Sequence, residues 1–196
     1  MGRPLFSLIL LASPILNAQT PSSAHVQAPY LPLTLDERIE FFAEGAFAGP
    51  QALFRAGVSA AFAQNDNSPP EWGQGADAYG RRYASAFTTL LIRDAAESAG
   101  AAALGQDPRY ERCRCSGLFP RFGHAVASRF VTRNREGKKR FAAARVGAQF
   151  VAGMSTVAWY PERYNYQGDG LRFGARLLGF GTISSLVQEF VVQPRH

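Results

Sequence analysis

The chain has 196 residues, a length that suits one domain with a sizeable core and is too short for two domains of ordinary size. Hydrophobic residues make up 46% of it and charged residues 18%, and this balance excludes general disorder. The formal net charge is +6, and more than half of the Lys and Arg residues lie between positions 109 and 145.

Residues 1–18 have the order of features of a secretory signal peptide. Arg3 provides a basic start, residues 5–12 form an apolar run, and small residues close the segment. No cysteine follows the apolar run, so the attachment pattern of bacterial lipoproteins is missing. We therefore predict export to the periplasm or the outer membrane without a lipid anchor. Residues 19–33, rich in Pro, Ser, Ala and Gln, are expected to tether a helical domain at 34–192 flexibly.

Capping residues and apolar periodicity predict an all-α fold, built as a single bundle of five to six helices. Thr34 and Glu37 form a capping box at a helix start, and Gly49 followed by Pro50 ends one helix and begins the next. Residues 65–70 (NDNSPP) have the composition of a loop. The expected helices cover residues 34–48, 50–64, 76–104, 119–132, 141–160 and 170–192. No segment alternates with a period of two for long, so no sheet is expected.

The helix expected at 141–160 is apolar around most of its circumference and has to be enclosed by other helices or by lipid. One side of it carries small residues such as Ala148, which let a neighbouring backbone approach closely. The helix expected at 170–192 has its own stripe of small residues, which includes Gly181. We predict that these two helices pack together, with Ala148 and Gly181 in or beside the contact. A bulky residue at either position should cost about 1–3 kcal/mol through overpacking.

Residues 109–145 contain eleven lysines and arginines and only two acidic residues. In an exported protein this concentration of charge favours contact with an anionic membrane surface or an envelope protein, and nucleic acid is not expected as a partner. The alternative is a solvated basic face with a few internal ion pairs. The residues expected to contact the anionic surface are Arg121, Arg129, Arg133, Lys138, Lys139 and Arg140, with Trp72 and Tyr110 as interfacial aromatic residues.

A membrane-spanning helix at 141–160 is a second interpretation of the same region. Basic residues precede this segment, and Trp159 and Tyr160 end it, as is typical of transmembrane helices. The segment is nevertheless rich in Ala and Gly, and it contains Arg145. These features favour a buried helix of the bundle.

The sequence contains no pattern typical of catalysis or of cofactor binding. A GxSxG motif is missing, and His124 is the one histidine within the expected helical domain. Cys113, Cys115 and His124 could offer ligands to zinc, but no fourth ligand is evident and the spacing matches no zinc finger. A disulfide between the two cysteines would close a very small loop, so the fold should not depend on it. We expect no catalytic residue, no metal and no cofactor.

Three carboxylates, Glu71, Asp77 and Asp107, lie next to aromatic or arginine-rich residues and suggest an alternative function. Glu71 precedes Trp72, and Asp107 begins the sequence DPRY. A carboxylate beside an aromatic ring can have a raised pKa and act as a proton donor, although such residues more often cap helices or pair with arginine. The alternative is a small enzyme or ligand-binding protein. Its pocket would be lined by Glu71, Trp72, Tyr79, Asp107, Arg109 and Tyr110.

Five short motifs occur along the chain, namely EWGQG at 71–75, YGRR at 79–82, DPRY at 107–110, FVTR at 130–133 and WYP at 159–161. In this order, over residues 35–190, the chain resembles a family of exported bacterial proteins that has no assigned activity. The resemblance implies a single envelope-associated helical domain and supplies no mechanism. The two cysteines are not part of the pattern. The function we expect is therefore that of a non-enzymatic envelope protein with a basic face.

Overall fold

Six α-helices and one short β-hairpin are found in residues 30–48 and 50–191, the part of the chain that the computed structural model describes. The helices are α1 (Leu35–Ala43), α2 (Pro50–Asn65), α3 (Ala76–Leu104), α4 (Leu118–Ala127), α5 (Ala143–Thr156) and α6 (Leu171–Phe190). The hairpin pairs β1 (Val131–Arg133) with β2 (Lys139–Phe141). The all-α class is confirmed. The predicted signal peptide and most of the predicted tether lie outside the described residues.

The ends of two helices form as their sequences predict. At the start of α1, the Thr34 hydroxyl accepts the Glu37 N–H at 3.3 Å, and the Glu37 carboxylate accepts the Thr34 N–H at 2.7 Å. Helix α3 has the predicted bounds. It ends at Gly105, whose φ of 62° lies in the left-handed region that glycine adopts without strain.

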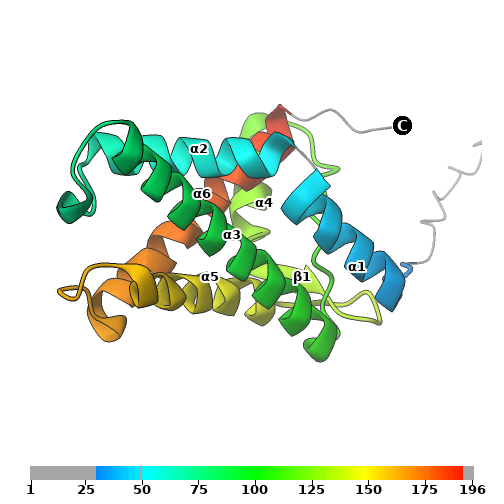
Figure 1. Cartoon of the computed structure of the whole chain (residues 1–196). Helices are drawn as coiled ribbons and strands as arrows, with labels where there is room; N and C mark the ends of the chain where they lie inside the picture. The colour runs from blue at the N-terminus through cyan, green and yellow to red at the C-terminus, as the bar shows by residue number, and fades with distance from the viewer. Residues whose placement is uncertain (1–29, 49, 192–196) are drawn as a thin grey trace, which may run out of the picture.

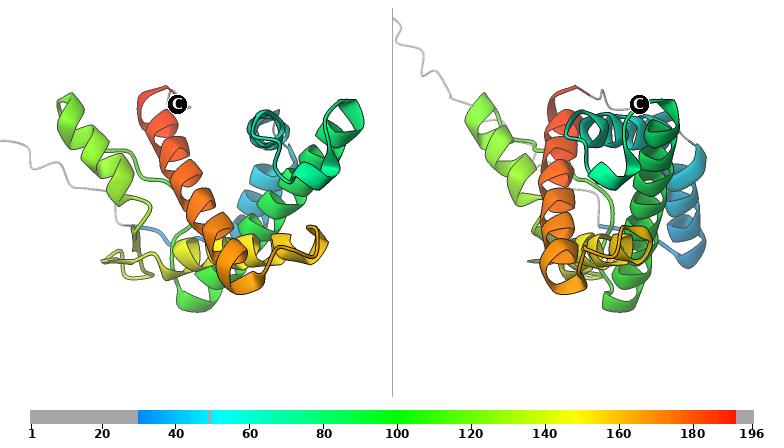
Figure 2. Two further views of the ribbon diagram at one scale, coloured as in Figure 1. Left: turned by 90° about the vertical axis from the view of Figure 1, so that its left-hand side faces the viewer. Right: turned by 60° about the vertical axis from the view of Figure 1, so that its left-hand side comes forward.

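Helices α3 and α5 pack against each other at the centre of the fold (Figure 1). Helix α2 packs on α3, and α6 packs on α5. Figure 2 shows α3 and α6 rising from α5 in different directions. Helix α4 packs on α6, on the side away from α2 and α3. The hairpin joins α4 to α5. Its turn lies at the edge of the molecule in Figure 1, and β2 is exposed along its whole length.

The predicted packing of small residues between α5 and α6 is present, but at a different point from the one expected. A Cβ atom added to Gly153 would collide with the backbone of Gly174, and one added to Gly174 would lie 2.8 Å from the Cα atom of Phe150. These contacts bring the two backbones together near the start of α6. Ala148 is buried, whereas Gly181 faces the guanidinium group of Arg129 and not α5. Gly181 is therefore small to accommodate an arginine.

The helix predicted at 119–132 ends at Ala127, and a β-hairpin takes the place of its last residues and of the following turn. Gly137, with a φ of 73°, allows the chain to reverse between the strands. Strand β1 is also held from its other side, because Thr132 donates its hydroxyl proton to the Asp107 carbonyl. Asp107 N–H in turn donates to the Arg133 carbonyl at 2.9 Å. These long-range contacts outweigh the local helical preference.

The interior is polar, and many large apolar side chains lie outside it. Arg82, Gln149 and Glu189 are among the largest fully buried side chains, whereas the buried apolar residues are mostly alanines. Alanine and glycine let the helices approach so closely that little room remains between them for larger side chains. The exposed large apolar residues include Leu35, Ile39, Leu53, Phe54, Phe62, Leu118, Phe119, Phe122, Phe141, Ile183 and Val191.

No helix in the described part of the chain combines the length and the apolar character needed to cross a membrane. In residues 141–160, for which a membrane-spanning helix was the second interpretation, Arg145 of α5 is 6% exposed and forms an ion pair with Glu97 of α3. The segment is thus a helix of the bundle.

Candidate functional site

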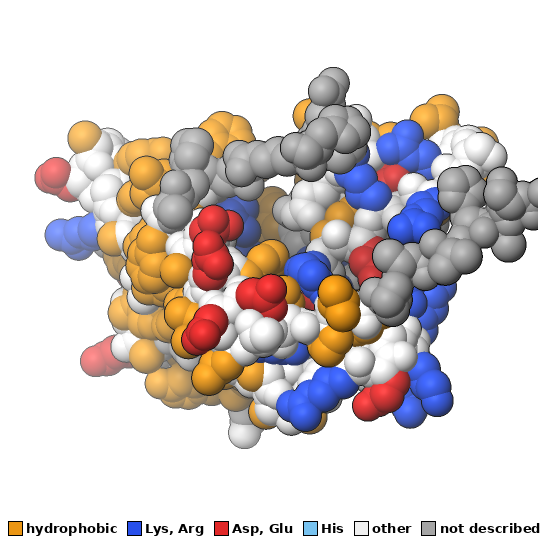
Figure 3. Space-filling model, turned by 90° about the vertical axis from the view of Figure 1, so that its right-hand side faces the viewer, with side chains coloured by type: hydrophobic (Ala, Val, Ile, Leu, Met, Phe, Trp, Pro, Cys, Tyr) orange, Lys and Arg blue, Asp and Glu red, His pale blue; other side chains and the backbone are white. Residues whose placement is uncertain are grey.

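Three of the six predicted basic residues lie together on the hairpin and are exposed. Lys138 belongs to the turn, and Lys139 and Arg140 belong to β2. No carboxylate of the described residues lies within ion-pair distance of any of the three. In Figure 1 the turn of the hairpin points to the right. Figure 3 views the molecule from that side and shows Lys and Arg side chains gathered on the right of this face. The charges of these residues are therefore available to a partner.

Apolar side chains flank these cations. Val131 and Phe141 are opposite each other across the two strands, so their side chains share one face of the hairpin, and both are exposed. Lys139 points to the same face, since it is two residues from Phe141. We define the hairpin surface as Val131, Lys138, Lys139, Arg140 and Phe141.

Helix α4, just before the hairpin, adds a second exposed apolar group. Phe119 is 91% exposed, and its neighbours Leu118 and Phe122 are also mostly exposed. A phenylalanine with this exposure gains almost no stabilisation from burial of its apolar area. Groups of such exposed apolar residues mark interaction sites. Positive charge on the hairpin surface and apolar area at the start of α4 are therefore both exposed.

Of the other three predicted basic residues, two are ion-paired and one is largely enclosed. Arg121 donates through Nε to Glu189 at 2.9 Å and covers the ring of Phe190, and Arg133 pairs with Glu111 at 2.6 Å. Arg129 is largely enclosed. Burial lowers its pKa to about 10. Arg121 and Arg133 thus form ion pairs within the protein, as the alternative interpretation predicted for part of the basic segment, whereas Arg129 forms no ion pair among the described residues and its buried Nε has no hydrogen-bond partner there.

The buried carboxylate of Glu189 organises the C-terminal end of α6. It accepts hydrogen bonds from Arg121, from the Tyr110 hydroxyl at 2.9 Å and from the Cys113 N–H at 3.2 Å. Burial acts to raise the pKa of Glu189, but these three donors outweigh it and hold the pKa below its usual value. Burial and the neighbouring carboxylate raise the pKa of Tyr110. Tyr110 is thus a partner of Glu189 rather than an interfacial aromatic residue.

Asp107 and Arg109 form a second internal cluster with Tyr30. The Tyr30 hydroxyl and the Arg109 guanidinium each donate to the Asp107 carboxylate at 2.6 Å. Burial acts to raise the pKa of Asp107, but the hydrogen bonds outweigh it and lower the pKa. Burial and Asp107 raise the pKa of Tyr30 to about 12. Tyr30 and Arg109 satisfy the Asp107 carboxylate, and Arg109 also donates to the Leu31 carbonyl at 3.0 Å, which favours a structural role over proton transfer.

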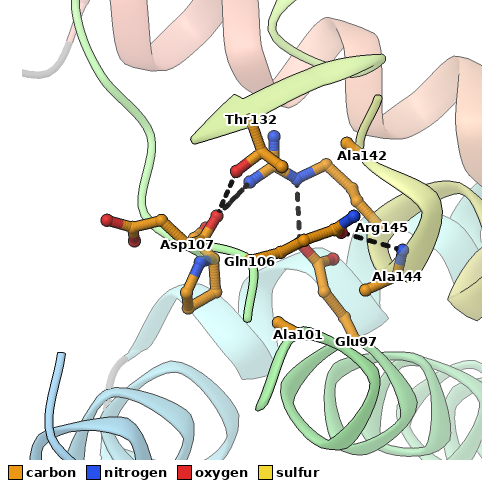
Figure 4. Close-up of a pocket in the computed structure, with 9 residues that line it drawn as sticks. Glu97, Ala101, Gln106, Asp107, Thr132, Ala142, Ala144 and Arg145 are labelled. Atoms are coloured by element: carbon orange, nitrogen blue, oxygen red, sulfur yellow. Dashed lines mark hydrogen bonds and ion pairs between the residues drawn. The ribbon is translucent and has the colours of Figure 1, made fainter. Parts of the chain in front are cut away.

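Arg145 joins this cluster to α3 and to Ser128 at the end of α4 (Figure 4). Its guanidinium donates to Glu97 at 2.8 Å and to the Pro108 carbonyl at 3.0 Å. Gln106 lies beside it, donating to the Phe141 carbonyl at 2.9 Å and accepting the Ala144 N–H at 3.1 Å. The side chains in Figure 4 leave no space for a water molecule. This region therefore locks three segments together and offers no room for a substrate.

The residues predicted to line one pocket fall into two groups. Asp107, Arg109 and Tyr110 follow the C-terminal end of α3, whereas Glu71, Trp72 and Tyr79 lie at its N-terminal end. The 29 residues of α3 separate the groups by about 40 Å. At the N-terminal end, Glu71 pairs with Arg163, and the Tyr79 hydroxyl donates to the Gly57 carbonyl at 3.3 Å. The two groups do not share a pocket.

A shallow cavity of about 360 Å³, widely open to solvent, lies at the N-terminal end of α3, and it includes one of the predicted pocket residues. Its lining residues are Trp72, Arg81, Ala84, Ser85, Thr88 and Trp159. Sequence analysis indicated Trp72 alone. For the four lining residues of α3, the signal was their spacing. It places Arg81, Ala84, Ser85 and Thr88 on one face of the helix.

Cys113 and Cys115 form a disulfide with each other. His124 lies near them in the chain, but its Nε2 atom is 2.7 Å from the Glu111 carbonyl, and its ring packs against Tyr110. The part of the chain that the structure describes contains no group of three or more His, Cys, Asp or Glu residues arranged to hold a metal ion.

Comparisons with protein-family models, with curated proteins and with solved structures gave no match. The resemblance based on the five motifs therefore stays a prediction, and function has to be argued from the surfaces and the cavity described above.

Proposed function

We propose that this chain is a non-enzymatic protein of the bacterial envelope that binds an anionic membrane surface through its hairpin surface and α4. One observation carries the proposal: Lys138, Lys139 and Arg140 are exposed, they have no carboxylate partner among the described residues, and exposed apolar side chains flank them. Cations next to exposed apolar side chains are typical of proteins that lie on a membrane without crossing it.

The two parts of this surface would act together. Each Lys or Arg near an anionic membrane contributes about 1 kcal/mol, so three cations alone give weak attachment. Insertion of Phe119 and its neighbours on α4 would add about 25 cal/mol for each Å² of apolar area removed from water. Location in the envelope is supported by the signal-peptide features of residues 1–18 and by the family resemblance.

Flotation with lipid vesicles tests the proposal. The protein is expected to float with phosphatidylcholine vesicles that contain phosphatidylglycerol, and to stay behind with phosphatidylcholine alone or at high salt. The double variant Lys138→Gln/Lys139→Gln should bind at least about tenfold more weakly. The control Arg172→Gln/Arg176→Gln removes the same charge from exposed positions at the start of α6, which the length of α5 separates from the hairpin by about 20 Å. It also removes the surface ion pair of Arg172 with Asp169, and it should bind like the parent.

Two results would overturn membrane binding: no flotation with either vesicle, or equal losses in the two double variants. The envelope location has its own test. Fractionation of cells that produce the full chain should place it in the envelope without residues 1–18, and an intact chain in the cytoplasm would contradict the location.

A further inference from the structure

The cavity at the N-terminal end of α3 has the size and composition of a small-molecule site. Its volume of about 360 Å³ lies in the usual range for such sites. One wall is a face of α3. The others carry Trp72, from the short helical turn before α3, and Trp159, from the turn after α5. The turn after α5, distant in sequence, thus meets α3 and the segment just before it around one space.

The walls of the cavity are fixed before any ligand arrives. The Trp159 indole N–H donates to the Ser85 hydroxyl at 2.8 Å, which ties the turn after α5 to α3. Trp72 packs its ring against Tyr160, with the ring centroids 5.1 Å apart. Arg82 holds the loop before α3 through several backbone carbonyls, among them that of Gly73 at 2.9 Å. Walls held in this way lower the cost of ordering the site when a ligand binds.

Two polar groups of the lining lack a partner among the described residues. Arg81 is exposed and forms no ion pair or hydrogen bond there, and the Thr88 hydroxyl forms no hydrogen bond. They lie two turns apart on the same face of α3, at positions i and i+7. A guanidinium can bind a carboxylate or a phosphate with two hydrogen bonds.

The charges around the cavity also favour an anion. Arg82 is 2% exposed, and the acceptors of its guanidinium are carbonyl and amide oxygens, so no carboxylate neutralises it. Glu71, the carboxylate next to Trp72, is already paired with Arg163. A cation without a counter-ion raises the electrostatic potential around it.

We propose that this cavity binds a small anion that carries a ring with an apolar face. The indole rings of Trp72 and Trp159 would contact the ring, and Arg81, with the Thr88 hydroxyl, would bind its carboxylate or phosphate group. An aromatic acid and an acidic sugar share this chemistry. The proposal does not depend on membrane binding, because the cavity and the hairpin surface lie at opposite ends of α3.

Intrinsic fluorescence tests the proposal directly, because the only two tryptophans of the chain both line the cavity. The full chain, without lipid, is titrated with phenylacetate and with glucuronate, exciting at the red edge of the tryptophan band. Matched neutral ligands are phenylethanol and glucose, and acetate is the anion without a ring. A saturable change with phenylacetate identifies aromatic acids, and one with glucuronate identifies acidic sugars.

The variant Arg81→Gln should raise the dissociation constant at least about tenfold. Arg135→Gln, an exposed arginine about 35 Å away along α3, should leave it unchanged. Thr88→Val provides a second lining variant should Arg81→Gln fail to fold. The proposal is overturned if neither ring anion saturates, if neutral ligands or acetate bind as well, or if the lining variants bind like the parent.

Discussion

Arg145 of α5 donates its Nε proton to the Glu97 carboxylate of α3 at 2.8 Å, and both side chains are largely removed from water. The same guanidinium binds the Pro108 carbonyl, so one residue connects α5 with α3 and with the segment that follows it. An ion pair in such a place is costly to break, because the remaining charge stays buried without a partner.

We therefore expect Arg145→Met and Glu97→Met to lower the free energy of unfolding by about 3–5 kcal/mol each. The double variant should lose less than the sum of the two, since it leaves no unpaired charge. Urea denaturation of the four proteins gives these values. Single losses under about 1 kcal/mol would show that the pair is as weak as a surface ion pair.

Gly153 is expected to tolerate no side chain. Gly153→Ala should cost about 1–3 kcal/mol, because its methyl group would collide with the backbone of Gly174. Gly147→Ala in the same helix meets no atom and should stabilise the protein by about 0.5–1 kcal/mol. Thermal or urea unfolding distinguishes them. Similar effects of both substitutions would mean that α5 and α6 do not approach closely at this point.

Glu189 should make stability depend on pH. Its pKa in the folded protein is below the usual 4.5, so its stabilising effect is present above about pH 4.5 and is lost as the pH falls toward the folded value. Glu189→Gln should cost about 1.5–3 kcal/mol at neutral pH and should lose less stability on acidification than the parent.

Urea unfolding at neutral pH and at about pH 3 measures this difference. The control is Glu136→Gln, which removes an exposed carboxylate of the hairpin turn and should keep the acid dependence of the parent. If Glu189→Gln loses as much stability as the parent on acidification, the carboxylate of Glu189 does not stabilise the fold.

Phe119 should contribute to membrane binding and not to folding. Phe119→Ser removes a side chain that is 91% exposed, so stability should change by less than about 0.5 kcal/mol. Partitioning to anionic vesicles should fall at least about tenfold, because a phenylalanine gains about 1.5–3 kcal/mol on leaving water. The control Phe54→Ser alters an exposed phenylalanine of α2, on the other side of the molecule (Figure 2). Equal effects of the two substitutions would argue against α4 as the inserted element.

Part of the candidate sites could be predicted from the sequence. The dense run of cations indicated Lys138, Lys139 and Arg140, and Trp72 was recognised as an aromatic residue of interest. Arg81 and Trp159 were missed as cavity residues, because they are 78 positions apart and meet only through the packing of α3 and α5. Arg121 and Arg133 were assigned to the surface, since nothing local shows that Glu189 and Glu111 pair with them.

The sequence by itself determined the elements that depend on neighbours within about four residues. Examples are the capping box of Thr34 and Glu37 and the start and end of α3. The sequence also showed that α5 and α6 carry small residues. Only the tertiary structure decided that the chain after Ala127 pairs as a hairpin and which cations remain free. It also decided that α5 and α6 approach each other closely at Gly153 and not at Gly181. An arginine can reach many acceptors, and its partner is selected by the fold that buries them together.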